Sequence, residues 1–203
     1  MVVRKITGVV VLVGIFVTLI AVINTIHFQF FPVNVVLYDT LKDVLIAGAL
    51  TGVIYYAALR GRLDLTGTEA TLSLFIGLLI GAFYAISVPT VIDRSLSIYI
   101  LEKLEQRGGG IRRDAFAGVF KDEYLPEHKL VDIRLTEQLN SRTIRIENGC
   151  VVLTDLGRRI AHFTRYYRTH ILPRQREVMG VYTDAITDPF RHSTSDVSYR
   201  CKP

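Results

Sequence analysis

Residues 147–168 read ENGCVVLTDLGRRIAHFTRYYR. The Asn-Gly pair in this stretch lies between two short runs rich in β-branched residues, 143–146 and 150–153. Such a pattern is a strong sequence signal for a β-hairpin. A long helix is expected to follow over residues 155–172, because apolar residues recur there at helical spacing and Pro173 then stops the helix. The stretch therefore predicts a strand pair followed by a helix.

Three shorter helices are expected upstream of the hairpin, over residues 96–106, 112–124 and 129–139. The glycines at 108–110 end the first helix, and Leu125-Pro126 breaks the second. The core candidates on these helices are Leu96, Ile100, Leu101, Leu104, Phe116, Val119, Phe120, Leu130, Ile133, Leu135 and Leu139.

The order helix, helix, helix, hairpin, helix resembles a winged-helix domain. The phrase IRIENGCVVLTDLGRRIA is similar to the wing and following helix of that superfamily, where a Leu-Thr-x-x-Gly step recurs. The resemblance covers about residues 95–170, and we assign residues 93–173 to this domain. It implies a fold and says little about function. The polar tail, 174–203, is expected to be disordered or loosely attached.

The first half of the chain has a different composition. Residues 1–92 contain five Lys/Arg and four Asp/Glu, whereas residues 93–203 contain nineteen and fifteen. About 20 apolar helical residues cross a bilayer core, and we expect spans at about 6–26, 42–60 and 71–92. A buried soluble helix is the alternative for the middle one. The predicted fold class is therefore mainly α, with a three-helix transmembrane domain followed by a winged-helix (α+β) domain containing one β-hairpin.

The transmembrane domain carries small residues at four-residue spacing, a pattern that lets helix backbones approach closely in lipid. The candidate packing residues are Gly48, Gly52, Gly77 and Gly81. They could join spans two and three into a hairpin or mark a surface for another membrane protein. Residues 27–43 are expected to form an interfacial loop or short helix. The charge-free stretches of the expected spans, 6–26, 44–59 and 71–92, contain no Asp, Glu, Lys, Arg or His, which argues against an ion pathway.

Charge distribution argues against DNA as a partner, although a winged helix often binds DNA. Residues 93–154 contain ten Lys/Arg and ten Asp/Glu, whereas residues 155–177 contain six arginines and two acidic residues. DNA affinity comes largely from neutralised phosphates, so the neutral region is a poor DNA surface. The last helix also carries an apolar stripe, expected to pack into the domain core: Leu156, Ile160, Phe163 and Tyr167. Its arginines remain available for lipid phosphates or an acidic partner: Arg158, Arg159, Arg165 and Arg168.

A second candidate for lipid phosphate is the run Asp93, Arg94 and Ser95, just after the third span. Its alternative role is a helix cap with an arginine that anchors the span. Cys150 and Cys201 are too few for a disulfide framework, and we expect a small buried residue and a free tail thiol. No catalytic motif was found, and we expect no cofactor and no metal site.

Three spans, then VPTVIDRSLSIYIL, then a winged-helix-like domain is similar to uncharacterised bacterial inner-membrane proteins associated loosely with envelope polysaccharide genes. Basic residues on the two sides, four against five, do not decide orientation. Because winged helices are cytosolic modules, we expect the C-terminal domain in the cytoplasm.

The predicted function is an accessory or scaffold protein of a membrane assembly. The expected partners are membrane lipids and another membrane protein or a second copy. The alternatives are a membrane-tethered DNA-binding regulator and a lipid-phosphate-binding component of a glycan synthesis or transport system.

Overall fold

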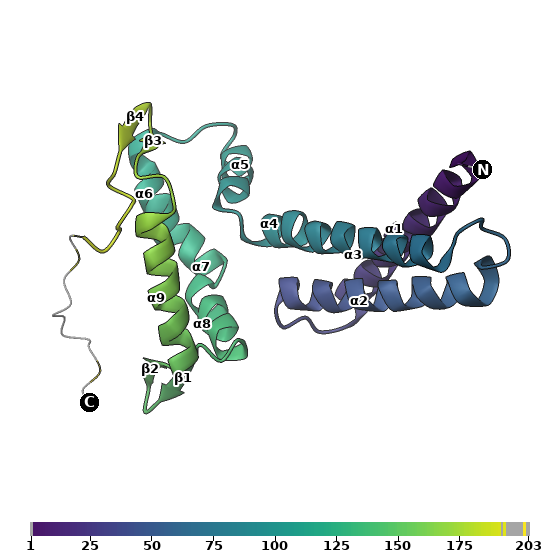
Figure 1. The fold of residues 1–203 in the computed structure, drawn as a ribbon. Coiled ribbons are helices and arrows are strands. Elements are labelled where there is room, and N and C mark those ends of the chain that lie inside the picture. The colour runs from purple at the N-terminus through teal and green to yellow at the C-terminus, as the bar shows by residue number, and fades with distance from the viewer. Residues whose placement is uncertain (1, 192, 194–200, 202–203) are drawn as a thin grey trace. The chain divides into compact units, whose positions relative to one another are not determined.

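The computed structural model describes residues 2–191, 193 and 201. The chain divides into two compact units, Met1–Arg113 and Asp114–Pro203 (Figure 1). Within the described residues, both units are mainly helical, and two small antiparallel strand pairs lie in the second.

Three helices of the first unit are long and apolar enough to cross a membrane, as predicted from the sequence. Helix α1 spans Val2–Phe30, α2 spans Val36–Ile54 and continues as the π-turn η1, Tyr55–Leu59, and α3 spans Gly67–Ser87. Pro89 starts the short helix α4, Pro89–Arg94, which prolongs the third span. Helix α5 follows over Leu96–Gln106.

Two of the long helices bury a residue at almost every fourth position. In α1 the buried residues are Gly8, Leu12, Phe16, Ile20 and Asn24. In α3 they are Ala70, Ser73, Gly77, Gly81 and Ala85. Residues four apart form one row along a helix, so each helix presents a single narrow row to its neighbours. The ring of Phe16 packs with Ile20 of α1 and with Val44 and Ala47 of α2 in one core cluster.

The second unit has the predicted order of a helical region, a hairpin and a long helix (Figure 1). Its elements are η2 Arg113–Ala115, α6 Phe116–Gly118, the π-turn η3 Val119–Tyr124, α7 Leu125–Glu127, α8 Leu130–Asn140, β1 Ile144–Glu147, β2 Cys150–Leu153, α9 Asp155–His170, β3 Arg176–Val178 and β4 Val181–Thr183. Pro126 was expected to break a helix, but it lies in the first turn of α7, where its missing N–H is not needed. The break falls at Lys129, whose φ is 44°.

The joint between the hairpin and α9 is built by the Leu-Thr-x-x-Gly step. Strand β1 pairs with β2 in antiparallel register, Ile146 opposite Val151. Thr154 then caps α9, since its Oγ1 accepts from the Gly157 N–H at 3.1 Å and donates to the Arg142 carbonyl at 2.8 Å. This cap fixes where the helix begins.

The core expected for residues 93–173 is only partly correct. Val119 is buried, but α8 buries no residue, and the apolar stripe on α9 is exposed along its whole length. In α5 the buried residues are Tyr99 and Lys103, whereas the expected core residues Leu96 and Leu101 are exposed. Helical spacing showed that these helices are amphipathic, but it did not show which apolar faces would be buried against another element.

The C-terminal tail also differs from expectation. It forms a second hairpin, in which Val178 pairs with Val181. Cys150 and Cys201 form a disulfide across 51 residues, so the expectation of two unpaired cysteines is wrong. Two cysteines so far apart in sequence carry no spacing signal that would have predicted this bond.

Candidate functional site

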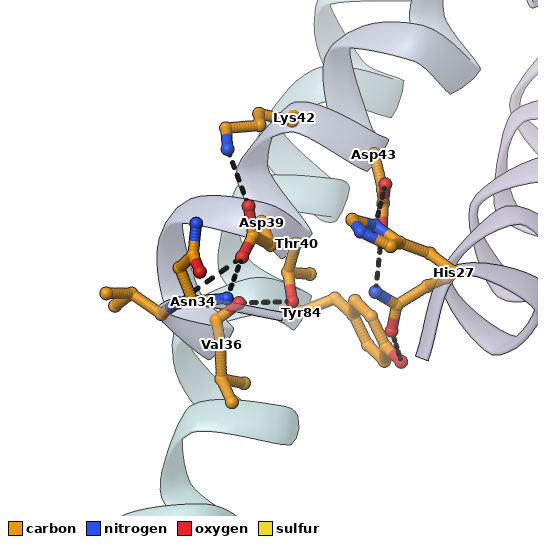
Figure 2. A network of polar contacts seen from close by, with 10 residues as sticks. His27, Asn34, Val36, Asp39, Thr40, Lys42, Asp43 and Tyr84 are labelled. Carbon is orange, nitrogen blue, oxygen red and sulfur yellow. Dashed lines mark hydrogen bonds and ion pairs between the residues drawn. The ribbon is translucent and has the colours of Figure 1, made fainter. Parts of the chain in front are cut away.

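A network of buried polar side chains links the three long helices at one end of the bundle (Figure 2). The Asp43 carboxylate accepts from Asn24 Nδ2 at 2.8 Å and contacts His27 Nδ1 at 2.8 Å. The Tyr84 hydroxyl donates to Asn24 Oδ1 at 3.1 Å. These four residues, which we call the Asp43 network, come from α1, α2 and α3, and the Asp43 side chain is only 2% exposed.

A second carboxylate, Asp39, organises the start of α2 one turn away. It accepts from the backbone N–H groups of Asn34 at 2.8 Å and Val35 at 3.3 Å, and from Lys42 Nζ at 2.6 Å. A carboxylate is favoured at a helix N-terminus because the backbone N–H groups there have no helical partner. Asp39 thus holds the loop between α1 and α2 against the first turn of α2.

A groove with a volume of about 350 Å³ opens beside the Asp43 network. Its lining combines apolar side chains with polar ones: Ile23, Ile26, His27, Phe31, Lys42, Asp43 and Ile46. Since the Asp43 carboxylate engages Nδ1 of His27, a neutral imidazole there presents Nε2 as the acceptor. The groove can therefore accommodate a hydrocarbon chain on its apolar wall and a polar group near His27 and Lys42.

The sequence prediction missed this site because it placed residues 27–43 in an interfacial loop or short helix between the spans. The structure continues α1 to Phe30 and begins α2 at Val36, so ionisable residues do lie inside the candidate spans, among them His27 in the first and Asp39 and Asp43 in the second. The expectation that the spans hold none is therefore wrong. A sequence signal was present, since Asp39 and Asp43 are four residues apart and would share one helix face.

The predicted packing glycines all lie along α2 and α3. A Cβ on Gly77 would stand 2.9 Å from Phe16 Cγ, and one on Gly81 would stand 2.8 Å from Val44 Cγ1. A Cβ on Gly48 would stand 2.8 Å from Leu78 Cδ2, whereas the nearest atom to one on Gly52, Leu74 Cδ1, is 3.8 Å away. Three of the four glycines thus allow close contacts inside the bundle.

The run Asp93–Ser95 forms local contacts. Arg94 Nε pairs with the Asp93 carboxylate at 3.0 Å, and Ser95 Oγ caps α5 by accepting from the Ile98 N–H at 3.3 Å. The cap is the alternative role foreseen for this run. The remaining candidates, Arg158, Arg159, Arg165 and Arg168, are all exposed on α9, far in sequence from the Asp43 network.

Comparison with protein-family models, with curated proteins and with solved structures finds no match for this chain. Its function must therefore be argued from its own residues. Among the residues that the structure describes, no three His, Cys, Asp or Glu side chains gather in a way that could hold a metal ion. The features that remain are the polar groove of the first unit and the exposed apolar surfaces of the second.

Proposed function

We propose that this chain is an integral membrane accessory protein that acts as a scaffold. Three apolar helices hold it in the bilayer, and its second unit, which we propose to be winged-helix-like, binds a protein partner. A place in the envelope polysaccharide assembly of a bacterial inner membrane is part of the proposal and rests on the sequence resemblance alone.

The observation that carries the proposal is the uncovered apolar face of the first hairpin. Paired residues of antiparallel strands point to the same face, as do residues two apart along a strand. Ile146, Val151 and Leu153 therefore share one face of the β1–β2 hairpin, and they are between 44% and 49% exposed. An apolar cluster of this kind is stabilised by burial, at about 25 cal/mol per Å² removed from water, and marks a surface for a partner.

The test is purification of the full chain from native membranes in mild detergent. We expect wild-type protein to carry a stoichiometric protein partner and Val151→Asp to lose it. Arg145→Asp is the matched control, because Arg145 alternates to the opposite hairpin face and should keep the partner. A wild-type chain that purifies as a clean monomer would contradict the scaffold function.

The disulfide is the observation that bears most directly on which side of the membrane the second unit lies. The sequence favoured the cytoplasm, but disulfides persist in oxidising compartments and are rare in the cytosol. The Cys150–Cys201 bond therefore favours the extracytoplasmic side for the second unit. With the three candidate spans found among the described residues, the start of α1, with Arg4 and Lys5, then lies in the cytoplasm, and we propose this orientation.

A second candidate function, binding of a lipid phosphate, is favoured by the groove beside His27. Its apolar wall suits an acyl or prenyl chain, and Lys42 lies where a phosphate could pair with it. Native mass spectrometry of the full chain should show less retained phospholipid for Lys42→Gln than for wild type. Lys42→Arg, which keeps the charge, should retain it, and equal retention in all three proteins would exclude this function.

A further inference from the structure

Helix α9 is the most strongly amphipathic helix of the second unit. At about 100° per residue, its four apolar stripe residues fall within a sector of about 60°. All four are exposed, Phe163 the most at 64%: Leu156, Ile160, Phe163 and Tyr167. The helix also carries four arginines and a single acidic residue, Asp155.

The tail of the chain covers a different side of α9. Asp188 Oδ2 lies 3.4 Å from Arg165 Nη2, and Asp188, Pro189 and Phe190 line a groove of about 730 Å³ along the helix. Arg165 projects roughly opposite to the apolar stripe, and none of the four stripe residues lines this groove. The stripe therefore stays uncovered by the described part of the tail.

Charge identifies what can cover the stripe. Arg159 and Arg168 flank the stripe, so two α9 helices packed stripe to stripe would bring two arginine-rich surfaces together, and like charges repel. An occupant that is both anionic and apolar matches the helix. The headgroup region of a bilayer with anionic lipids has both properties.

We propose that α9 lies on the surface of the bilayer that holds the three spans, with its apolar stripe at the acyl boundary and the flanking Arg159 and Arg168 among anionic lipid phosphates. This inference rests on the proposed membrane placement. A single weak signal gives only marginal binding to a membrane surface. Here the spans supply the tether, so the helix does not have to recruit the protein from solution.

The experiment uses the full chain reconstituted in nanodiscs of phosphatidylcholine alone or of phosphatidylcholine with phosphatidylglycerol. Hydrogen exchange of the α9 amides is measured in both. We expect exchange to be about tenfold slower in the anionic discs, because each arginine near the surface adds favourable energy. In 1 M salt, where the Debye length is about 3 Å, most of this difference should disappear.

Two variants separate charge from folding. Replacing Arg159 and Arg168 together by glutamine should abolish the lipid-dependent slowing, whereas replacing both by lysine should keep most of it. In neutral discs all three proteins should exchange at similar rates, which shows that the helix itself is intact. Exchange that is the same in both lipids, or that slows only when two copies share a disc, would overturn the proposal.

Failure of this inference about α9 can be distinguished from failure of the proposed function. A chain that does not remain in the discs contradicts the membrane placement, and this inference with it. A chain that inserts and binds its protein partner, yet shows no lipid-dependent exchange in α9, contradicts this inference alone.

Discussion

Gly157 and Thr143 meet backbone to backbone: a Cβ on Gly157 would overlap the Thr143 carbonyl oxygen. The same oxygen accepts from the Thr154 N–H at 3.1 Å. The threonine and the glycine of the Leu-Thr-x-x-Gly phrase therefore have separate physical roles. The threonine caps α9, and the glycine lets that helix approach the entry of β1.

Gly157→Ala should open this joint. Any side chain here meets backbone, which cannot move aside as a flexible side chain can, and overpacking of this kind costs about 1–3 kcal/mol. Hydrogen exchange should accelerate in both the hairpin and the first turn of α9. Gly149→Ala is not a suitable control, because Gly149 has φ of 76°. Gly118→Ala is suitable, since its nearest neighbour would be 3.7 Å away, and unchanged exchange in both variants would refute the explanation.

Thr154 allows an independent test of the cap. Thr154→Ser keeps the acceptor for the Gly157 N–H and should behave like wild type. Thr154→Val keeps the shape but loses the hydroxyl, at a cost of about 1 kcal/mol of helix stability. Exchange of the first-turn α9 amides in the full chain measures the difference, and equal rates in the two variants would show that the cap contributes nothing.

The sequence predicted this joint well because its causes are local. The turn residues, the strand runs and the start of the helix all lie within about 25 consecutive residues. Each of these elements is therefore determined by residues close to it in the sequence. The Asp43 network was missed for the opposite reason. It depends on where α1 ends and α2 begins, and helix ends are less well determined by composition than helix existence. Tertiary packing decides which apolar faces stay exposed, and the periodicity of a sequence carries no information about tertiary packing.

Within the three-helix bundle, Gly81 and Gly52 form a matched pair. Gly81→Ala places a Cβ 2.8 Å from Val44 Cγ1 and 2.9 Å from Phe16 Cζ, in the centre of the bundle. We expect it to lower the free energy of unfolding in detergent by about 1–3 kcal/mol. Gly52→Ala meets nothing closer than 3.8 Å and should be neutral or stabilising by up to about 1 kcal/mol. Similar effects of the two substitutions would contradict the packing described above.

The Asp43 network predicts graded losses of stability. Tyr84→Phe removes one hydrogen bond at the edge of the network and should cost about 0.5–1.5 kcal/mol. Asp43→Ala leaves both Asn24 and His27 without their partner, at about 1–3 kcal/mol for each group left unsatisfied. Unfolding of the full chain in detergent measures both. A Tyr84→Phe cost equal to or above that of Asp43→Ala would show that the carboxylate is not the centre of the network.

The disulfide makes the orientation measurable in intact cells. With the second unit in an oxidising compartment, a membrane-impermeant maleimide should label the chain only after reduction, because Cys150 and Cys201 are its only cysteines. Cys201→Ser frees Cys150 and should permit labelling without reduction. Labelling of neither protein from outside, together with labelling of wild type after lysis without reduction, would place the unit in the cytoplasm.

The ring of Phe16 connects the glycines of α3 to both other long helices. A Cβ on Gly77 or on Gly81 would stand 2.9 Å from an atom of this ring. The same ring packs with Ile20 of α1 and with Val44 and Ala47 of α2. A larger residue at either glycine would therefore displace a side chain that all three helices share, and its effect would reach α1 and α2 as well as α3.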